Sequence, residues 1–122
     1  MINWRPDWEE NGDNHFRFFG LWEWSEYEPA CQPYVILKMY ATLRETHKGR
    51  WIVDSSASQW SIEHGAAQQR FVLNTGRKRW AYPTKADAWA SFMIRQRHRI
   101  NHARNNLIGM EALTLFIEAH KP

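Results

Sequence analysis

The sequence has few of the features that staple or anchor a small protein. Its single cysteine, Cys31, allows neither an internal disulfide nor a zinc site built from several cysteines. No apolar run approaches the roughly 20 residues that a membrane-spanning helix needs. The acidic start MINWRPDWEE also lacks the basic and apolar parts of a secretory signal. These absences predict a cytoplasmic protein without a membrane contact.

Metal and cofactor signatures are equally scarce. The sequence has no GxGxxG run, P-loop, HExxH pair or EF-hand loop. His98 and His102 have the four-residue spacing that can place two imidazoles on one metal ion. No acidic residue lies within a turn of them, however, and Arg95 and Arg99 share their side of the predicted helix, so a solvated helix face explains them better. We therefore expect no bound metal or cofactor.

Candidate nucleophiles also lack the partners that catalysis needs. Glu63 and His64 follow the serines of residues 55–61, but nothing in the pattern fixes a triad or an oxyanion hole. Cys31 follows a run of acidic residues, which disfavours a reactive thiolate. The sequence therefore predicts a protein that is not an enzyme.

Tryptophan, by contrast, is abundant. The chain of 122 residues carries eight, and four of them, Trp4, Trp8, Trp22 and Trp24, lie in the first 34 residues. Most are expected in the core, but eight indoles are difficult to bury with partners for every N–H group, so at least one should be exposed. Exposed tryptophan anchors many protein interfaces, and the excess therefore favours a binding surface.

The charge is divided unevenly along the chain. Residues 1–34 contain seven acidic and two basic residues, a net charge of −5. Because the whole chain has a net charge of +3, residues 35–122 carry +8. Most of the positive charge lies between Arg70 and Arg104, where Asp87 is the single acid. Two explanations remain open: charged partners or self-association, or an acidic N-terminal arm lying across the basic face of its own domain.

Alternating residues predict the first strands. Residues 34–44, YVILKMYATLR, have the period of two that is typical of a half-buried strand. Residues 46–49 supply a turn with glycine, and residues 50–54 are predicted to return as the second strand of a hairpin. Before them, the aromatic run HFRFFGLWEW at residues 15–24 favours a further strand.

A second hairpin is predicted after a loop. Residues 55–69 are polar and contain small residues, which indicates a loop or a short helical turn. Residues 70–74 and 78–82 are predicted to pair around a turn at Asn74-Thr75-Gly76, with Pro83 ending the outgoing strand.

The C-terminal third predicts helix. Thr84 is a good N-cap, and Asp87 three residues later favours the positive end of the helix dipole. At 100° per residue a stripe falls on one side of this helix, comprising Trp89, Phe92, Met93, Gln96, Ile100, Ala103 and Leu107. The helix is expected to run to about residue 107, with a second helical segment over residues 110–119, and whether Gly109 breaks or only bends the helix stays open.

Together these elements predict one α+β domain over residues 1–122, with an acidic aromatic arm (1–34), strands (34–82) and a helical part (84–119). An antiparallel sheet of three to five strands should be covered on one face by the basic amphipathic helix, with the shorter helical segment after it. The residues expected in the core are Leu37, Met39, Val53, Phe71, Leu73, Trp89, Met93 and Ile100.

The predicted helix carries cations on both flanks of its apolar stripe. Arg95, Arg99 and His102 lie on one flank, and Arg97 and Arg104 on the other. Such residues commonly extend past a buried face to solvent. The alternative is a phosphate-binding ridge, continued by the basic run at residues 77–79. The signatures of common nucleic-acid modules, such as RNP motifs, a GXXG loop or a helix-turn-helix, are missing.

The run KRWAYPTKADAWASFMIRQRHRI at residues 78–100 resembles small uncharacterised proteins of tailed phages and prophages, in which an aromatic strand ends in Ala-Tyr-Pro-Thr and opens a basic helix. The residues that carry the resemblance are Ala81, Tyr82, Pro83, Thr84, Ala88, Phe92 and Arg95. The resemblance implies a phage context in the cytoplasm of a bacterial host cell. Small phage proteins of this size often bind a host factor, as anti-CRISPR proteins and other counter-defence inhibitors do.

The sequence leads to two functional hypotheses. The first is stoichiometric binding to a host protein of a defence or nucleic-acid-handling system, with an acidic aromatic contact surface formed by Trp22, Glu23, Trp24 and Glu26. The alternative is direct nucleic-acid binding by Arg77, Lys78, Arg79, Arg95 and Arg99.

Overall fold

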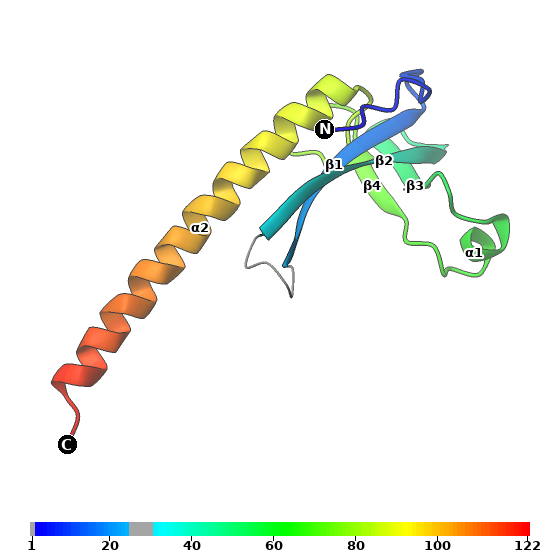
Figure 1. The fold of residues 1–122 in the computed structure, drawn as a ribbon. Helices are drawn as coiled ribbons and strands as arrows, with labels where there is room; N and C mark the ends of the chain where they lie inside the picture. The colour runs from blue at the N-terminus through cyan, green and yellow to red at the C-terminus, as the bar shows by residue number, and fades with distance from the viewer. Residues whose placement is uncertain (1, 25–30) are drawn as a thin grey trace. The chain divides into compact units, whose positions relative to one another are not determined.

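The computed structural model describes residues 2–24 and 31–122, which form a four-stranded antiparallel sheet and two helices (Figure 1). The elements are β1 (Asn14–Trp24), β2 (Cys31–Glu45), β3 (Gly49–Asp54), α1 (Gln59–Glu63), β4 (Arg70–Leu73) and α2 (Lys85–Ala119). Each strand pairs with the next one along the chain, in the order β1-β2-β3-β4. The predicted α+β architecture is confirmed.

The alternating segments form the strands that their pattern predicts. β1 and β2 pair along the whole of β1, from Asn14 opposite Ala41 to Trp24 opposite Cys31. The expected hairpin of β2 and β3 is present, with an irregularity in the register between Thr42 and Arg44. The loop after β3 contains the short helix α1, in the region where a helical turn was expected.

The predicted second hairpin is wrong, because residues 78–82 do not form a strand beside β4. β4 ends beside the turn that joins β2 to β3. There the backbone N–H of Asn74 donates to the carbonyl oxygen of Lys48 over 3.0 Å. Tyr82 instead forms an isolated antiparallel bridge with Phe16 of β1, through two backbone hydrogen bonds of 2.7 and 3.0 Å. The Asn74-Thr75-Gly76 turn signal was real, but local sequence does not say which strand follows a turn.

α2 begins as expected and continues further than expected. The hydroxyl oxygen of Thr84 accepts a 3.2 Å hydrogen bond from the backbone N–H of Asp87, as an N-cap does. The helix then runs without a break through Gly109, so the two predicted helical segments are one (Figure 1). A glycine costs only about 1 kcal/mol in a helix interior, which the flanking turns can offset.

The main core forms between one face of β1 and β2 and the first two turns of α2. Its buried residues are Phe16, Phe18, Leu37, Tyr82, Ala88 and Phe92. The ring of Phe18 lies edge-on to the ring of Trp89, with 5.2 Å between centroids. Such aromatic packing contributes roughly 0.5–1.5 kcal/mol per pair beyond the burial of area. The start of α2 therefore covers the sheet, as predicted.

Of the predicted core residues, Leu37 and Val53 are buried, and Met39 and Trp89 are half-buried against the core. Phe71 and Leu73 are exposed, so their prediction was wrong. In β4 the buried side chain is Val72, which joins a second core cluster with Ile52. Side chains alternate between the two faces of a strand. If the buried face is assigned one residue out of step, every buried residue is therefore predicted as exposed and every exposed one as buried.

Met93 and Ile100 of the predicted core are exposed as well. They belong to the stripe whose first residues, Trp89 and Phe92, do reach the core. A period of 3.6 identifies a continuous apolar face but does not say what covers it. The sequence pattern therefore could not show where the intramolecular contact ends.

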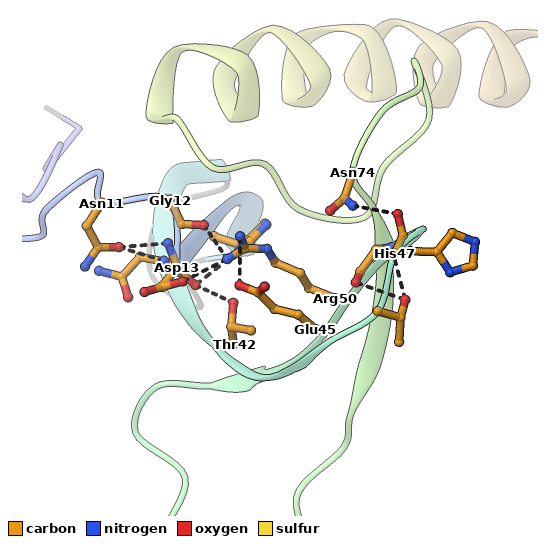
Figure 2. Close-up of polar contacts among 12 residues, drawn as sticks. Asn11, Gly12, Asp13, Thr42, Glu45, His47, Arg50 and Asn74 are labelled. Carbon is orange, nitrogen blue, oxygen red and sulfur yellow. Dashed lines mark hydrogen bonds and ion pairs between the residues drawn. The ribbon is translucent and has the colours of Figure 1, made fainter.

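The segment before β1 is held on its own sheet and helix. The ammonium group of Lys85, the first residue of α2, donates to the backbone carbonyl oxygens of Arg5 and Trp8 at 2.6 and 2.8 Å. Figure 2 shows the second attachment: the guanidinium of Arg50 donates to the carbonyl oxygen of Gly12 at 2.8 Å and to the carboxylate of Asp13 at 2.9 Å. Of these contacts, the ion pair of Arg50 with Asp13 joins an acid of this segment to a base of its own domain, while the others are accepted by backbone carbonyl oxygens.

The chain divides into two units, Met1–Phe92 and Met93–Pro122. The first contains the sheet, α1, the start of α2 and both core clusters. The second contains the rest of α2, in which every residue from 97 to 122 is exposed.

Candidate protein-binding surface

The far half of the β1–β2 pair forms a two-stranded ribbon, made of residues 19–24 and 31–36. β3 begins to pair with β2 only at Tyr40, and the bridge from Tyr82 meets β1 at Phe16. Within residues 2–24 and 31–122, no strand therefore pairs with the outer edges of the ribbon. Figure 1 shows β1 and β2 continuing together beyond their partners.

The ribbon presents two tryptophans on one face. Trp22 lies opposite Pro33 and Trp24 opposite Cys31, so both indoles share the face that carries Phe16 and Phe18 further back. Their side chains are 53% and 70% exposed. Large aromatic side chains with that much exposed area form the anchors of many protein interfaces.

The position of the last covered residue explains this exposure. A Cβ atom added at Gly20 would lie 3.0 Å from the Phe92 ring, so the helix start covers the ribbon face as far as Gly20. Trp22 and Trp24 are the next two residues on that face. The same period of two that buries Phe16 and Phe18 thus places two further aromatic residues beyond the core.

The opposite face of the ribbon is also apolar. Leu21 lies opposite Tyr34, and Phe19 lies opposite Ile36. Leu21, Tyr34 and Ile36 are exposed, as is Glu23 at the end of the strand. An ordinary surface hairpin has one solvated polar face. Here the face opposite the tryptophans also exposes large apolar side chains, and its polar residues are Glu23 and Gln32 at the end of the ribbon.

Of the predicted protein-binding residues, the structure places Trp22, Glu23 and Trp24 at the end of β1, with the two tryptophans on one face and Glu23 on the other. Glu26 lies outside the described residues. Sequence reasoning missed Leu21, Tyr34 and Ile36, because the alternation of residues 34–44 indicated a strand but not which residues of β1 lie beside it. The missing information was the pairing register of β1 with β2, which tertiary structure supplies.

The predicted nucleic-acid residues are divided between the two units. Arg77 and Lys78 are exposed, but Arg79 supports the fold: its guanidinium lies 4.8 Å from the centre of the Tyr82 ring and donates to the carbonyl oxygen of Asn74. In the second unit, Arg95 is half-buried and Arg99 is exposed. The residues predicted to bind nucleic acid thus fall in two separate units, with Arg77, Lys78 and Arg79 in the first and Arg95 and Arg99 in the second.

A cavity of about 490 Å³ lies between the other sheet face and the α1 segment. Trp80, on its wall, has the guanidinium groups of Arg17 and Arg70 at 4.6 and 4.2 Å from its ring centre. Burial, and next the charge of Asp54, raise the pKa of Tyr40 to about 12, so its hydroxyl stays protonated at neutral pH. Because cations already occupy the Trp80 ring, a nucleic-acid base could stack there only by displacing one of them.

The serines near His64 serve helix α1. Ser58 is its N-cap and accepts a hydrogen bond from the backbone N–H of Ser61. The Nδ1 atom of His64 donates to the carbonyl oxygen of Trp60 over 2.8 Å, and the imidazole stacks on the indole. These hydrogen bonds hold a helix end and do not align a base with a nucleophile.

The part of the chain that the structure describes contains neither a metal-binding cluster nor a membrane-spanning helix. No three histidine, cysteine or acidic side chains gather closely enough to hold a metal ion within that part of the chain. None of the helices there has the length and apolar character needed to cross a bilayer. Comparisons of the chain with protein-family models, curated proteins and solved structures found no match. The resemblance to phage proteins therefore stays a prediction.

Proposed function

We propose that this chain is a non-enzymatic binding protein that forms a stoichiometric complex with another protein through the ribbon. The observation that carries the proposal is the exposure of Trp22 and Trp24 on one face of a two-stranded extension. Tryptophan is among the residues that contribute most to interface affinity, because it buries a large rigid area at a low entropic cost.

The backbone of the ribbon supports the same proposal. Its outer edges present N–H and C=O groups that an incoming strand can pair with, while the side chains on the two faces provide specificity. In the described residues these edges have no strand partner. A partner segment that adds as a strand would lie beside Trp22 at the β1 edge or beside Tyr34 at the β2 edge.

Charge and context narrow the partner that we would test first. Glu23 is exposed between Trp22 and Trp24 in β1, on the opposite face of the ribbon, and the first 34 residues have a net charge of −5. Both observations favour a basic partner surface. With the phage resemblance, we propose a bacterial host protein of a defence or nucleic-acid-handling system, inhibited by occlusion in the cytoplasm, as anti-CRISPR proteins act.

Affinity purification from a bacterial host lysate with mass spectrometry tests the proposal. The tagged chain should capture a defined protein at fixed stoichiometry, and Trp22→Ser/Trp24→Ser should abolish capture. The matched control is Trp60→Ser, because Trp60 is 64% exposed but lies in α1, away from the ribbon. Equal loss of capture with both variants would contradict a role for the ribbon.

Direct nucleic-acid binding is the alternative, supported by the exposure of Arg77 and Lys78. Titration of labelled DNA and RNA at two salt concentrations separates it from the first proposal, since phosphate contacts weaken steeply with salt. Tight, salt-sensitive binding that Arg95→Ala/Arg99→Ala abolishes, with no protein captured, would replace the protein-binding proposal with this one.

A further inference from the structure

The exposed part of α2 carries more apolar residues than a solvated helix needs. Between residues 93 and 117 the large exposed apolar side chains are Met93, Ile94, Ile100, Leu107, Ile108, Met110, Leu113, Leu115, Phe116 and Ile117. Helices in proteins are stabilised mainly by the packing of an apolar face. This part of the helix therefore requires a covering partner.

A heptad pattern runs through the same residues. Two series with a spacing of seven, offset by three, alternate along the helix: Met93, Ile100, Leu107 and Thr114 in one, and Gln96, Ala103, Met110 and Ile117 in the other. Apolar residues that recur at alternating steps of three and four form the seam of a coiled coil. We call the residues from Ile100 to Ile117 in these two series the seam.

The charges on one flank of the seam identify the partner. Directly after each residue of the second series comes a charged residue, in the order Arg97, Arg104, Glu111, Glu118. All four are exposed. From N- to C-terminus this flank carries two bases and then two acids. If a second helix of the same sequence runs antiparallel, its acids therefore lie opposite the bases of the first helix, and its bases opposite the acids.

We propose that residues 97–118 form an antiparallel two-stranded coiled coil with the same residues of a second copy of this chain. A two-fold axis perpendicular to the helices places each flank beside the same flank of the second copy, which runs in the opposite direction. Arg104 then meets the second copy's Glu111, and Arg97 meets its Glu118. In the seam, Leu107 packs against the second copy's Met110, and Ile100 against its Ile117.

The parallel arrangement lacks this complementarity. In a parallel pair, each residue of the charged flank faces the opposite flank of the preceding heptad. Arg104 would then meet the second copy's Arg99, and Glu111 would meet its Asn106. No Arg–Glu pair forms in that register, and like charges are brought together, so the antiparallel pair is favoured.

Sedimentation of the full chain over a range of concentrations tests the interface. The wild-type chain should form a dimer, and Leu107→Asp should raise the dimer dissociation constant by roughly 100-fold or more, because it places a charge in the seam. Ile108→Asp is the matched control: Ile108 is the next residue, as exposed as Leu107, but off the seam. It should change the constant by less than about threefold. A monomeric wild-type chain, a larger oligomer or an equal effect of both variants would overturn the proposal.

Charge exchange tests the register. Arg104→Glu and Glu111→Arg should each weaken the dimer, because each brings like charges together across the axis. The double variant restores both pairs in each dimer and should return the dissociation constant to within about threefold of the wild-type value. A double variant as weak as the single ones would overturn the assigned pairing.

Cysteine cross-linking tests the orientation. In a Cys31→Ser background, a mixture of Ile100→Cys and Ile117→Cys chains should form mainly the mixed disulfide, since only opposed positions lie within bonding reach. Disulfides formed mainly within each variant would indicate a parallel pair and overturn the antiparallel one. Dimerisation through this helix is independent of the ribbon, so Trp22→Ser/Trp24→Ser should leave the dissociation constant unchanged.

Discussion

The two units of the chain use similar apolar residues in opposite ways. In Met1–Phe92 aromatic side chains converge from β1, the Tyr82 segment and the start of α2 onto one core, whereas in Met93–Pro122 the apolar side chains lie on the surface of a helix. Composition does not distinguish these cases. The difference arises because the sheet and the first turns of α2 both have an apolar face, and these faces pack on each other. The later part of α2 has no second apolar surface within its own unit.

The strongest test of this comparison removes one phenylalanine from each unit. Phe18 is 1% exposed and contacts the rings of Trp4 and Trp89, so Phe18→Ala should lower the free energy of unfolding by about 3–5 kcal/mol. Phe116→Ala, on the exposed helix, should change it by less than about 0.5 kcal/mol. Urea denaturation followed by near-UV circular dichroism measures both. Similar losses would break the comparison.

A second test adds an atom to the tightly packed unit. At Gly49 an added Cβ would collide with the carbonyl oxygen of Val72 and with the Phe71 ring, both on the neighbouring strand. Gly49→Ala should therefore destabilise the first unit by about 1–3 kcal/mol, since the β3–β4 pair must shift. Thermal melts should show the lower midpoint, and an unchanged midpoint would mean that the two strands are not held so closely.

A third test uses the histidines. His15 is buried in β1, and burial lowers its pKa below 6.5, although its Nδ1–H donates to the carbonyl oxygen of Asp13. The unfolded state then binds a proton first as pH falls, so the contribution of His15 to stability is present above about pH 6.5 and is lost as pH falls toward the lower folded-state value.

Urea midpoints at pH 7.5 and 5.5, on either side of the ordinary histidine pKa of about 6.5, measure this effect. The wild-type chain should lose more stability between the two than His15→Gln does. His120→Gln should behave as wild type, because His120 is exposed in the second unit. A pH dependence that His15→Gln leaves intact would assign the loss to other groups.

The smallest expected effect has the opposite sign. Gly109 lies in the interior of α2 with nothing within 4 Å of an added Cβ. Gly109→Ala should therefore stabilise the helix by up to about 1 kcal/mol. Far-UV circular dichroism should show helical signal lost at a higher temperature, while the midpoint of the first unit stays the same. A loss of helical stability would contradict the open surroundings of Gly109.

Much of the fold could be predicted because strands and helix begin with strong local signals. The alternation of β2 and the N-cap at Thr84 depend on neighbours in the sequence, and both predictions are confirmed. The partner of residues 78–82 and the buried side of β4 could not be predicted, because both depend on contacts over long sequence distances. Tyr82, for example, bridges to Phe16.

The candidate site was predictable in part for the same reason. Trp22 and Trp24 are two residues apart, so their shared face follows once β1 is a strand, and Glu23 between them takes the other face. Leu21 and Tyr34 become neighbours only through the pairing of β1 with β2. The heptad pattern is also present in the sequence, but the core prediction assigned its residues Met93 and Ile100 to the contact with the sheet.

The core that joins β1 to the start of α2 also sets an order of events during synthesis. Phe16 and Phe18 emerge early from the ribosome, yet their neighbours Tyr82, Ala88 and Phe92 are added more than 60 residues later. At roughly 5–20 residues per second, the first strand waits several seconds or more for the side chains that cover it. During that interval its aromatic face is open to chaperones and to other nascent chains, and residues 93–119 emerge only after the last core residue has been made.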